Sequence, residues 1–301
     1  MKPRFYFLFT FFSLLFLFYP GNSLYFDIFA YNRALLATNQ PHRQIRKASI
    51  PYVKAAYYPE ISAEGVYVAD LPSFTPVLKR NPHAKLFPAS TTKVLTALVA
   101  YDIYKPDQII TIKNVQPEGQ VMGLVPGERI TVENLLYGTL VHSGNDAAYA
   151  LGQNYGLADF VTLMNKKAQA LKMTDSHFTN PAGLDDSNQY STAYDLALAG
   201  RTLLENSYLA KIVSTKEIII SDVDFKYFHT LTNVNKLLGK VQGIGGLKTG
   251  STPEAGENLV SLYKRNDGHE FIIVILKSFD RFKDTQNAVS WLDNNVAYST
   301  L

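Results

Sequence analysis

Apolar residues recur with different spacings in different parts of the chain. Near the start, an uncharged and largely apolar run extends from Phe5 to Tyr19. Residues 65–79 and the residues after Ser214 show short alternating or apolar stretches typical of strands, whereas the region between them has mostly the spacing of helices. This pattern predicts a two-lobed α/β (α+β) fold. An antiparallel sheet would be built from both ends of the chain, with flanking helices and a helical lobe inserted at about residues 115–213.

The expected strands are short and separated by Gly, Pro, Asn and Asp. They cover residues 65–69, 76–79, 108–112, 217–220, 247–249, 258–263 and 271–276. The sequence Asn266-Asp267-Gly268 between the last two is typical of a tight turn, so these two strands should form an antiparallel hairpin.

The expected helices begin at recognisable capping residues. Thr131 and Thr192 are candidate N-caps, and Asp195 after Thr192 resembles a capping box. A helix that starts near Pro88 has few polar positions over residues 94–100 and should be buried. Further helices are expected over residues 133–140, 146–151, 158–171 and 285–296.

Composition narrows the class of protein. The chain has 301 residues, of which 47% are hydrophobic and 18% charged, so it can bury a sizeable core in one globular domain. A net charge of +3, without a basic cluster interleaved with aromatic residues, gives no indication of nucleic-acid binding. The absence of cysteine excludes disulfides, thiolate metal sites and a cysteine nucleophile.

The first residues have the pattern of an export segment. Lys2 and Arg4 precede the apolar run, and the small residues Gly21 and Ser23 follow it. This predicts a signal peptide over residues 1–23 that is cleaved after Ser23, or an uncleaved signal anchor. Because positive charge stays inside, both alternatives put the rest of the chain outside the cytoplasm. Residues 24–50 are expected to be a linker and residues 51–301 the catalytic domain.

The residue pair Ser90 and Lys93 is the first candidate for chemistry. The two residues are three apart at the start of the buried helix, which puts them side by side on one face. A buried lysine that stays neutral can take the proton of a serine and make it a nucleophile. A second Ser-x-x-Lys, Ser261 with Lys264, lies in an alternating stretch where positions three apart point to opposite faces.

Two further motifs follow the first. Ser143 and Asn145 lie on the break between two helices, where ordinary turn chemistry is the simpler explanation for either residue alone. Lys248-Thr249-Gly250 lies on an expected strand, and it offers a cation and a hydroxyl suited to a carboxylate. His177, in the long polar loop of residues 174–190, is interpreted as a hydrogen-bonded structural histidine.

Ser-x-x-Lys, Ser-x-Asn and Lys-Thr-Gly, in this order, form the set of motifs found in penicillin-binding proteins and class A β-lactamases. The chain resembles the low-molecular-mass penicillin-binding proteins of the D-alanyl-D-alanine carboxypeptidase family, and the resemblance covers roughly residues 55–295. The similar segments are residues 87–93, 126–128, 135–138, 143–148, 180–184, 190–195 and 248–250. The resemblance implies a β-lactamase/DD-peptidase-like fold.

The resemblance also implies a serine-type carboxypeptidase that removes the terminal D-alanine from peptidoglycan stem peptides through an acyl-enzyme, without metal or cofactor. Ser90 would be the nucleophile and Lys93 its base. Ser143, facing Lys93, would pass a proton to the departing amine, and Asn145 would bind the peptide and orient Lys93. β-Lactams would act as covalent inhibitors.

The strand motif completes the implied site. Lys248 and Thr249 would hold the substrate's terminal carboxylate, and Gly250 permits close approach of the peptide. The N–H groups of Ser90 and Ser251 would stabilise the oxyanion. Many members of the family have an aromatic residue or His in place of Ser251, so contacts beside the scissile bond are expected to differ here.

Three alternatives stay open. The first is a DD-endopeptidase that cuts cross-links with the same residues. The second is a class A β-lactamase, which would need a Glu-x-x-Leu-Asn segment. Between Asn145 and Lys248 the only glutamates are Glu205 and Glu217, and neither begins such a segment. The third is a catalytically silent peptidoglycan-binding protein. Well-known relatives continue into a second β-domain and a membrane anchor, so any membrane contact here is expected through the amino terminus alone.

Overall fold

A computed structural model describes residues 3–18, 49–54, 57–116 and 118–300, in two units that divide between Ala48 and Ser49. In the first unit, helix α1 covers Pro3–Phe18. Among the helices in the described part of the chain, none is long and apolar enough to cross a membrane. The expected cleavage position after Ser23 and residues 24–48 of the expected linker lie outside the described residues.

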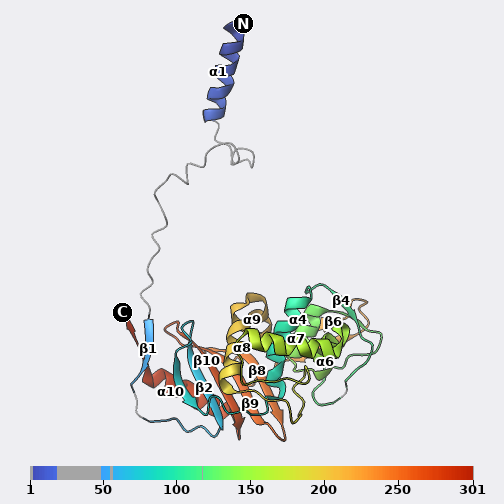
Figure 1. The fold of residues 1–301 in the computed structure, drawn as a ribbon, viewed down its shortest axis with the longest axis vertical. Coiled ribbons are helices and arrows are strands. Elements are labelled where there is room, and N and C mark those ends of the chain that lie inside the picture. The colour runs from blue at the N-terminus through green and yellow to red at the C-terminus, as the bar shows by residue number, and fades with distance from the viewer. Residues whose placement is uncertain (1–2, 19–48, 55–56, 117, 301) are drawn as a thin grey trace. The chain divides into compact units, whose positions relative to one another are not determined.

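The second unit is organised around a five-stranded antiparallel sheet (Figure 1). The strand order is β3-β2-β10-β9-β8, so the sheet joins an early part of the chain to a late part, as predicted. The strands are β2 (Gly65–Leu71), β3 (Pro76–Arg80), β8 (Ile244–Thr252), β9 (Gly256–Lys264) and β10 (Glu270–Ser278). Strand β10 lies in the centre and pairs with both β2 and β9.

The two faces of the sheet belong to different cores. Along β10, Ile272, Val274 and Leu276 belong to the core shared with the helical lobe, whereas the alternate residues Phe271 and Ile273 belong to the core against α10. Burying an aliphatic side chain of this kind contributes about 1.5–3 kcal/mol. Because both faces are covered, β10 is an almost continuous apolar run rather than a strictly alternating one.

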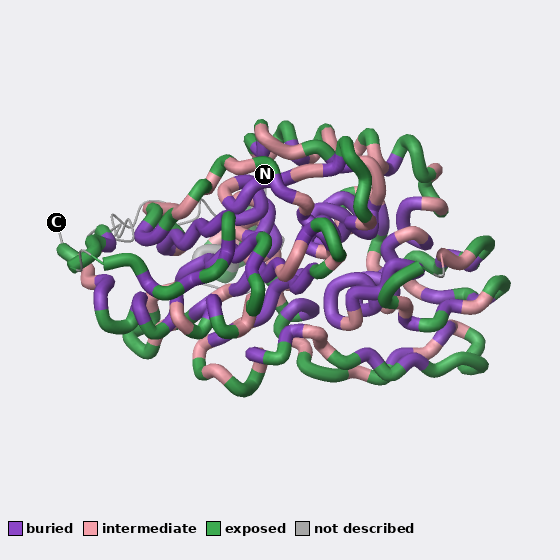
Figure 2. Tube along the Cα trace, turned by 90° about the horizontal axis from the view of Figure 1, so that it is seen from below, coloured by how far each residue is buried: buried purple, intermediate pink, exposed green. Residues whose placement is uncertain are grey.

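Helices cover both faces. Helix α8 (Ala193–Glu205) packs against β2 and β10 from one side, and α10 (Arg281–Asn295) packs against β9 and β10. Buried residues therefore run through the interior of the unit, and exposed ones gather at its turns (Figure 2). The predicted terminal helix is present but begins at Arg281 instead of Thr285, because the side chain of Asp280 caps it by accepting from the N–H groups of Phe282 and Lys283.

The helical lobe follows β3 and ends before β6. It contains the 3₁₀ turn η1 (Ala89–Thr92), α4 (Lys93–Ile103), α5 (Val132–Leu140), α6 (Asn145–Tyr155), α7 (Leu157–Ala170) and α9 (Ser207–Val213), together with α8. Residues 93–100 of α4 are all buried, as the apolar pattern predicted.

The threonine caps are present. Thr131 accepts from the N–H of Asn134, and Thr192 accepts from the N–H of Asp195. The Asp195 carboxylate does not return a bond to Thr192 and instead accepts from the N–H of Asp175 and the hydroxyl of Ser176. The expected capping box is therefore only half formed, since its acid is used to tie down the loop before α8.

Three two-stranded sheets lie beside the main one. They pair β1 (Ser49–Val53) with β11 (Val296–Thr300), β4 (Ile109–Thr111) with β5 (Arg129–Thr131), and β6 (Glu217–Ser221) with β7 (Phe228–Thr232). Strands β1, β5, β7 and β11 were not expected from the sequence. They are short and mix exposed with buried positions, so the partner strand defines them more than their own pattern does.

Candidate active site

Ser90 lies on a sharp turn at the entrance to α4. Pro88 precedes the 3₁₀ turn η1, and Lys93 is the first residue of the α-helix. Ala89 has a φ of +47°, a left-handed conformation that is costly for a residue with a side chain. The turn therefore presents Ser90, which is partly exposed, from a backbone that the surrounding structure must hold in place.

Two close contacts hold this turn. A Cβ on Gly183 would lie 1.9 Å from the carbonyl oxygen of Ala89, and a Cβ on Gly250 would lie 2.8 Å from the nitrogen of Ser90. Both distances are too short for any other residue, so the loop after α7 and strand β8 approach the serine backbone from different elements. Asn258 of β9 adds a hydrogen bond of 2.9 Å from its Nδ2 to the carbonyl of Phe87.

Lys93 is fully buried next to the serine. Its Nζ lies 2.8 Å from Ser90 Oγ, 2.6 Å from Asn145 Oδ1 and 2.6 Å from the carbonyl oxygen of Ala182. Burial lowers the pKa of Lys93 to about 7, although the nearby Asp146 carboxylate works in the opposite direction. Near neutral pH, a large fraction of the lysine is therefore uncharged.

The geometry decides where the lone pair of the neutral lysine points. The amide oxygen of Asn145 and the carbonyl of Ala182 can only accept hydrogen bonds, so they take the two N–H groups of the amine. The remaining direction faces Ser90 Oγ, whose hydroxyl can donate into it. This arrangement can remove the serine proton without any movement of the lysine.

Ser143 and Asn145 lie on the tight connection between α5 and α6, as expected. Asn145 begins α6, and Ser143 has a φ of +64°. The backbone N–H of Asn145 donates to the carbonyl of Gln120, and its Nδ2 donates to the carbonyl of Glu118 at 2.7 Å. The Asn145 amide is therefore fixed from both ends, by Lys93 and by the segment before β5.

Ser143 does not contact Lys93 in the way that the sequence suggested. Its Oγ accepts a 2.7 Å hydrogen bond from Lys248 Nζ, and no hydrogen bond joins Ser143 to Lys93 among the described residues. The reason is geometric, because the three contacts of Lys93 are already taken by Ser90, Asn145 and Ala182. Ser143 therefore lies in hydrogen-bond contact with Lys248 of strand β8 and not with Lys93.

Lys248 is buried on β8, and its Nζ also donates to the carbonyl of Thr249 at 2.8 Å. Burial lowers the pKa of Lys248 well below its ordinary value, and the positive charges of Lys93 and Arg281 lower it further. No carboxylate is within ion-pair distance of it among the described residues. A carboxylate bound here would supply the counterion that the site lacks and would favour the protonated form of Lys248.

Arg281 is a site residue that the sequence analysis missed. Its Nη1 donates to the carbonyl of Gly250 at 2.7 Å, and its buried Nε has no hydrogen-bond partner in the structure. Burial lowers the pKa of Arg281. The sequence did contain a signal for the start of this helix. Asp280 is a favourable N-cap residue, and recognising it would have predicted that the last helix begins at Arg281.

Thr249 and Ser251 follow Lys248 along β8. Thr249 is buried, whereas Ser251 is exposed and pairs in register with Glu257 of β9. Beside them, the hydroxyl of Thr252 donates to the carboxylate of Asp185 at 2.7 Å, which links β8 to the loop after α7. The structure thus brings the residues of the three motifs together, with Arg281 added.

The other candidates lie elsewhere. Ser261 is fully buried in β9, while Lys264 is exposed and pairs with Glu270 at 3.1 Å, so the second Ser-x-x-Lys is split between faces. His177 is exposed, and its Nδ1 contacts the carbonyl of Asn188 at 2.7 Å. Among the residues that the structure describes, no cluster of His, Asp or Glu could hold a metal ion.

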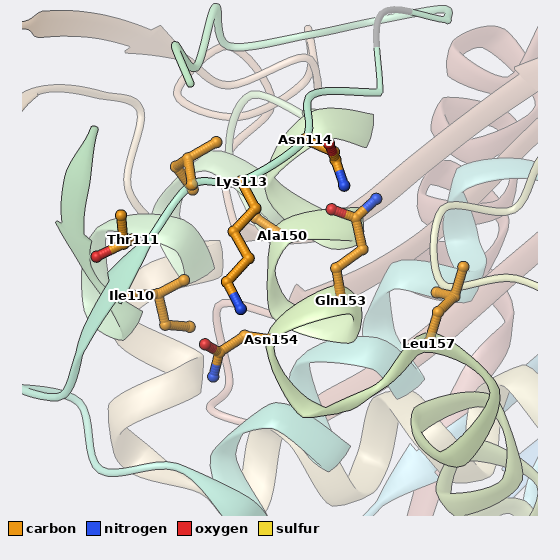
Figure 3. A pocket seen from close by; sticks show the side chains of 9 residues that line it. Ile110, Thr111, Lys113, Asn114, Ala150, Gln153, Asn154 and Leu157 are labelled. Atoms are coloured by element: carbon orange, nitrogen blue, oxygen red, sulfur yellow. The ribbon is translucent and has the colours of Figure 1, made fainter. Parts of the chain in front are cut away.

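A separate cavity of about 230 Å³ lies in the helical lobe (Figure 3). It is lined from β4, from the following segment with Lys113 and Asn114, and from the later turns of α6 with Gln153 and Asn154. Asn154 is nine residues beyond Asn145, or about 13 Å along the helix. This cavity contains no serine or carboxylate and is distinct from the site around Ser90.

The fold and the site together define a class of protein in which a serine at the start of a helix lies in hydrogen-bond contact with a buried lysine. Comparison with known proteins gives the family. A family model described as D-alanyl-D-alanine carboxypeptidase matches residues 52–280. The chain belongs to the D-alanyl-D-alanine carboxypeptidase family.

Curated relatives and a solved structure agree with this membership. The chain is 32% identical over 216 residues to D-alanyl-D-alanine carboxypeptidase DacF of Bacillus subtilis, covering 69% of this chain and 55% of the relative. It is 32% identical over 258 residues to DacD of Escherichia coli, covering 79% and 64%. This chain therefore spans less than two thirds of the length of either relative.

The structural similarity confirms the predicted fold. The crystal structure of D-alanyl-D-alanine carboxypeptidase from Mycobacterium tuberculosis superimposes with a TM-score of 0.75 at 30% identity. The superposition covers 81% of this chain and 96% of that one.

Proposed function

We propose that this chain is a serine-type D-Ala-D-Ala carboxypeptidase that removes the terminal D-alanine from peptidoglycan stem peptides through an acyl-enzyme. The observation that carries the proposal is the contact of 2.8 Å between Ser90 Oγ and the buried Lys93 Nζ, next to a cationic strand. Family membership supports the same reaction.

In the first step, Ser90 Oγ attacks the carbonyl carbon between the two D-alanines, and its proton passes to Lys93. The lone pair of Lys93 is directed to the serine by Asn145 and the Ala182 carbonyl, which supports this role. The N–H groups of Ser90 and Ser251 would stabilise the oxyanion, and the close approach of Gly250 to the Ser90 nitrogen is consistent with this arrangement.

In the second step, the C–N bond breaks and the terminal D-alanine departs with a proton from Ser143, which takes a replacement proton from its hydrogen-bond partner Lys248. Its carboxylate would be held by Lys248 and Thr249, with Arg281 as a further cation beside Gly250. The hydrogen bond between Lys248 and Ser143 connects carboxylate recognition to the group that protonates the leaving amine. Water then hydrolyses the ester: its hydroxyl adds to the acyl carbon, its proton passes through Ser143 to Lys248, and Lys93 returns the proton that restores Ser90. None of these steps is assigned to a metal or cofactor.

We also infer that the enzyme acts outside the cytoplasm, where peptidoglycan is found. The basic and apolar start of the chain supports export, either with cleavage after Ser23 or with retention as an anchor. In helix α1, large side chains such as Phe7 and Phe12 are exposed, with 73% and 56% of their surface accessible, which is consistent with an apolar partner. Membrane contact would involve this amino-terminal segment.

The test combines two assays on the purified chain. Incubation with a D-Ala-D-Ala peptide should release free D-alanine, and incubation with penicillin should add one penicilloyl group to the peptide that contains Ser90. The adduct should persist for minutes or longer, because the chain lacks the Glu-x-x-Leu-Asn segment with which class A β-lactamases activate the deacylating water.

Each alternative has its own outcome in these assays. Rapid turnover of penicillin without an accumulating adduct would support a β-lactamase. Cleavage of cross-linked muropeptides without release of terminal D-alanine would support a DD-endopeptidase. Peptidoglycan binding without either reaction would support a silent binding protein.

A further inference from the structure

The segment of residues 118–125, between β4 and β5, lies against the start of α6 and holds Asn145. The carbonyl of Glu118 accepts from Asn145 Nδ2 at 2.7 Å, and the carbonyl of Gln120 accepts from the backbone N–H of Asn145 at 2.7 Å. Because the other end of the same amide contacts Lys93, the position of segment 118–125 determines how Lys93 is oriented.

Two carboxylates hold the N–H groups of this segment. Asp146 accepts from the N–H groups of Met122, Gly123 and Leu124 at 2.9–3.1 Å. Glu128 Oε2 accepts from the N–H of Val125 at 3.0 Å. Both acids are almost fully buried, with 2% and 1% of their surface exposed.

His229, on strand β7, makes a further contact with the segment. Its Nδ1 lies 3.1 Å from the carbonyl oxygen of Met122, and its Nε2 lies 2.8 Å from Glu128 Oε1. His229 is 6% exposed. Both partners are acceptors, since a carbonyl has no proton and Glu128 Oε2 is accepting from Val125. With Glu128 ionised, both ring nitrogens must carry a proton for the two hydrogen bonds to form, and this is the charged imidazolium.

We propose that His229 is a positioning residue for the serine–lysine site, acting as a doubly protonated imidazolium that holds segment 118–125 and, through it, Asn145 and Lys93. The inference rests on the proposed function of that site. His229 touches no reacting group, and its effect passes through Met122 and Glu128 to the backbone that binds Asn145.

The charges around His229 agree with this protonation state. Glu128, by hydrogen bond and charge, raises the pKa of His229, and Asp146 adds to the effect, while burial works against it. The nearby cation Arg129 is directed to Asp224 at 2.9 Å instead. A raised pKa means that the contribution of the imidazolium is complete below about 6.5, the ordinary value, and is lost as the pH rises through the raised pKa.

Two substitutions separate the charge from the hydrogen bonds. In His229→Gln, the imidazolium and one donor are lost, so the acylation rate should fall by about tenfold, the factor expected for one hydrogen bond to a charged group. In Glu128→Gln, the new amide can donate to Nε2 of a neutral His229 while still accepting from Val125. His229 Nδ1–H then keeps its bond to Met122, so both contacts persist without the extra proton.

The experiment measures the rate of Ser90 acylation by penicillin from pH 6 to pH 10 in the full chain and in both variants. In the native chain the rate should decline at alkaline pH, whereas Glu128→Gln should lose that decline or shift it by at least about one pH unit. His177→Gln, which changes an exposed histidine outside this network, should keep the native profile. Nitrogen-15 NMR of the native chain should show two protonated ring nitrogens on His229 at pH 7.

Identical alkaline limbs in the native chain and Glu128→Gln would overturn the inference, and so would a neutral His229 at pH 7. A loss of thermal stability in His229→Gln with an unchanged acylation rate would reduce His229 to a structural residue and would also overturn it. If His229→Gln fails to fold, Glu128→Gln and the NMR measurement still decide. Failure of the native chain to react with penicillin at all would instead refute the proposed function.

Discussion

The amine of Lys93 and the hydroxyl of Ser90 lie 2.8 Å apart, and the lysine side chain is completely buried. Each of its other two contacts is a carbonyl-type oxygen, from Asn145 and from Ala182. The amine of Lys93 is therefore already directed to the Ser90 hydroxyl, and in the proposed mechanism the protonation state of Lys93 is the remaining variable.

This relationship predicts the acid limb of the pH profile. Because the pKa of Lys93 is lowered to about 7 and only the neutral amine can accept the serine proton, acylation should increase about tenfold per pH unit below 7 and approach a maximum just above it, before the alkaline decline attributed to His229. Stopped-flow measurement of penicillin acylation from pH 5 to pH 8 tests this. Lys93→Arg, which stays charged throughout, should lower the rate by about 10²–10⁴-fold at every pH. A midpoint near 10 in the native chain would contradict the assignment.

Ser90 and Ser261 make a matched pair of substitutions. Ser90→Ala should abolish covalent labelling by penicillin and change the free energy of unfolding by less than about 1 kcal/mol, since the residue is partly exposed. Ser261→Ala should leave labelling intact, because the buried Ser261 hydroxyl has no hydrogen-bond partner in the structure and Lys264 lies on the other face. Intact mass after incubation, together with thermal unfolding, distinguishes the two, and labelling that survives Ser90→Ala would refute the nucleophile.

Substitutions of Lys248 and Arg281 should impair the reaction chiefly with substrates that have a free terminal carboxylate. Removing a charge-assisted contact costs about 1.5–3 kcal/mol, so Lys248→Ala should lower kcat/KM for a D-Ala-D-Ala peptide by about 10–150-fold. The effect on the C-terminal amide of the same peptide should be much smaller. Arg281→Ala should show the same preference with a smaller loss, because its side chain is anchored on the Gly250 carbonyl. Lys264→Ala, an exposed strand lysine, is the control, and equal losses on acid and amide would contradict carboxylate recognition.

Gly183 and Gly268 test the packing of the turn that carries Ser90. Their φ angles are +85° and +88°, so alanine costs each position a similar backbone strain of about 1 kcal/mol. Only at Gly183 would the new Cβ lie 1.9 Å from the Ala89 carbonyl, whereas nothing lies within 4 Å at Gly268. Gly183→Ala should therefore slow acylation by penicillin strongly and destabilise the chain more than Gly268→Ala does. Similar acylation rates in both variants would show that the contact with Ala89 does not determine the position of Ser90.

The sequence predicted those helices, strands and turns that have a strong local pattern of apolar or turn-forming residues. The apolar strand around Val274, the buried helix after Ser90 and the turn at Asn266 each have a strong local signal, and all are present. Strand β1 was missed because it pairs with β11, which lies more than 200 residues later in the chain. The early start of α10 was missed because Asp280 was not recognised as its cap.

The sequence predicted which side chains form the site, but it did not predict the hydrogen bonds that join them. Ser90, Lys93 and Lys248 have short-range motifs, whereas the Ala182 carbonyl and the Glu118 carbonyl act through the backbone, which has no residue signature. The hydrogen bond between Ser143 and Lys248, in place of one to Lys93, depends on which donors are already used, and only the three-dimensional structure reveals that.

The central position of β10 affects when, during synthesis and folding, the site around Ser90 can form. Strand β10 pairs with both β2 and β9. The site combines Ser90, from the early part of the chain, with Lys248, which is synthesised much later. A nascent chain that ends before Glu270 carries the nucleophile but leaves the β2–β3 and β8–β9 hairpins unjoined. Pairing over such long sequence separations forms late and slowly. We therefore expect the site around Ser90 to become reactive only after β10 has paired with β2 and β9.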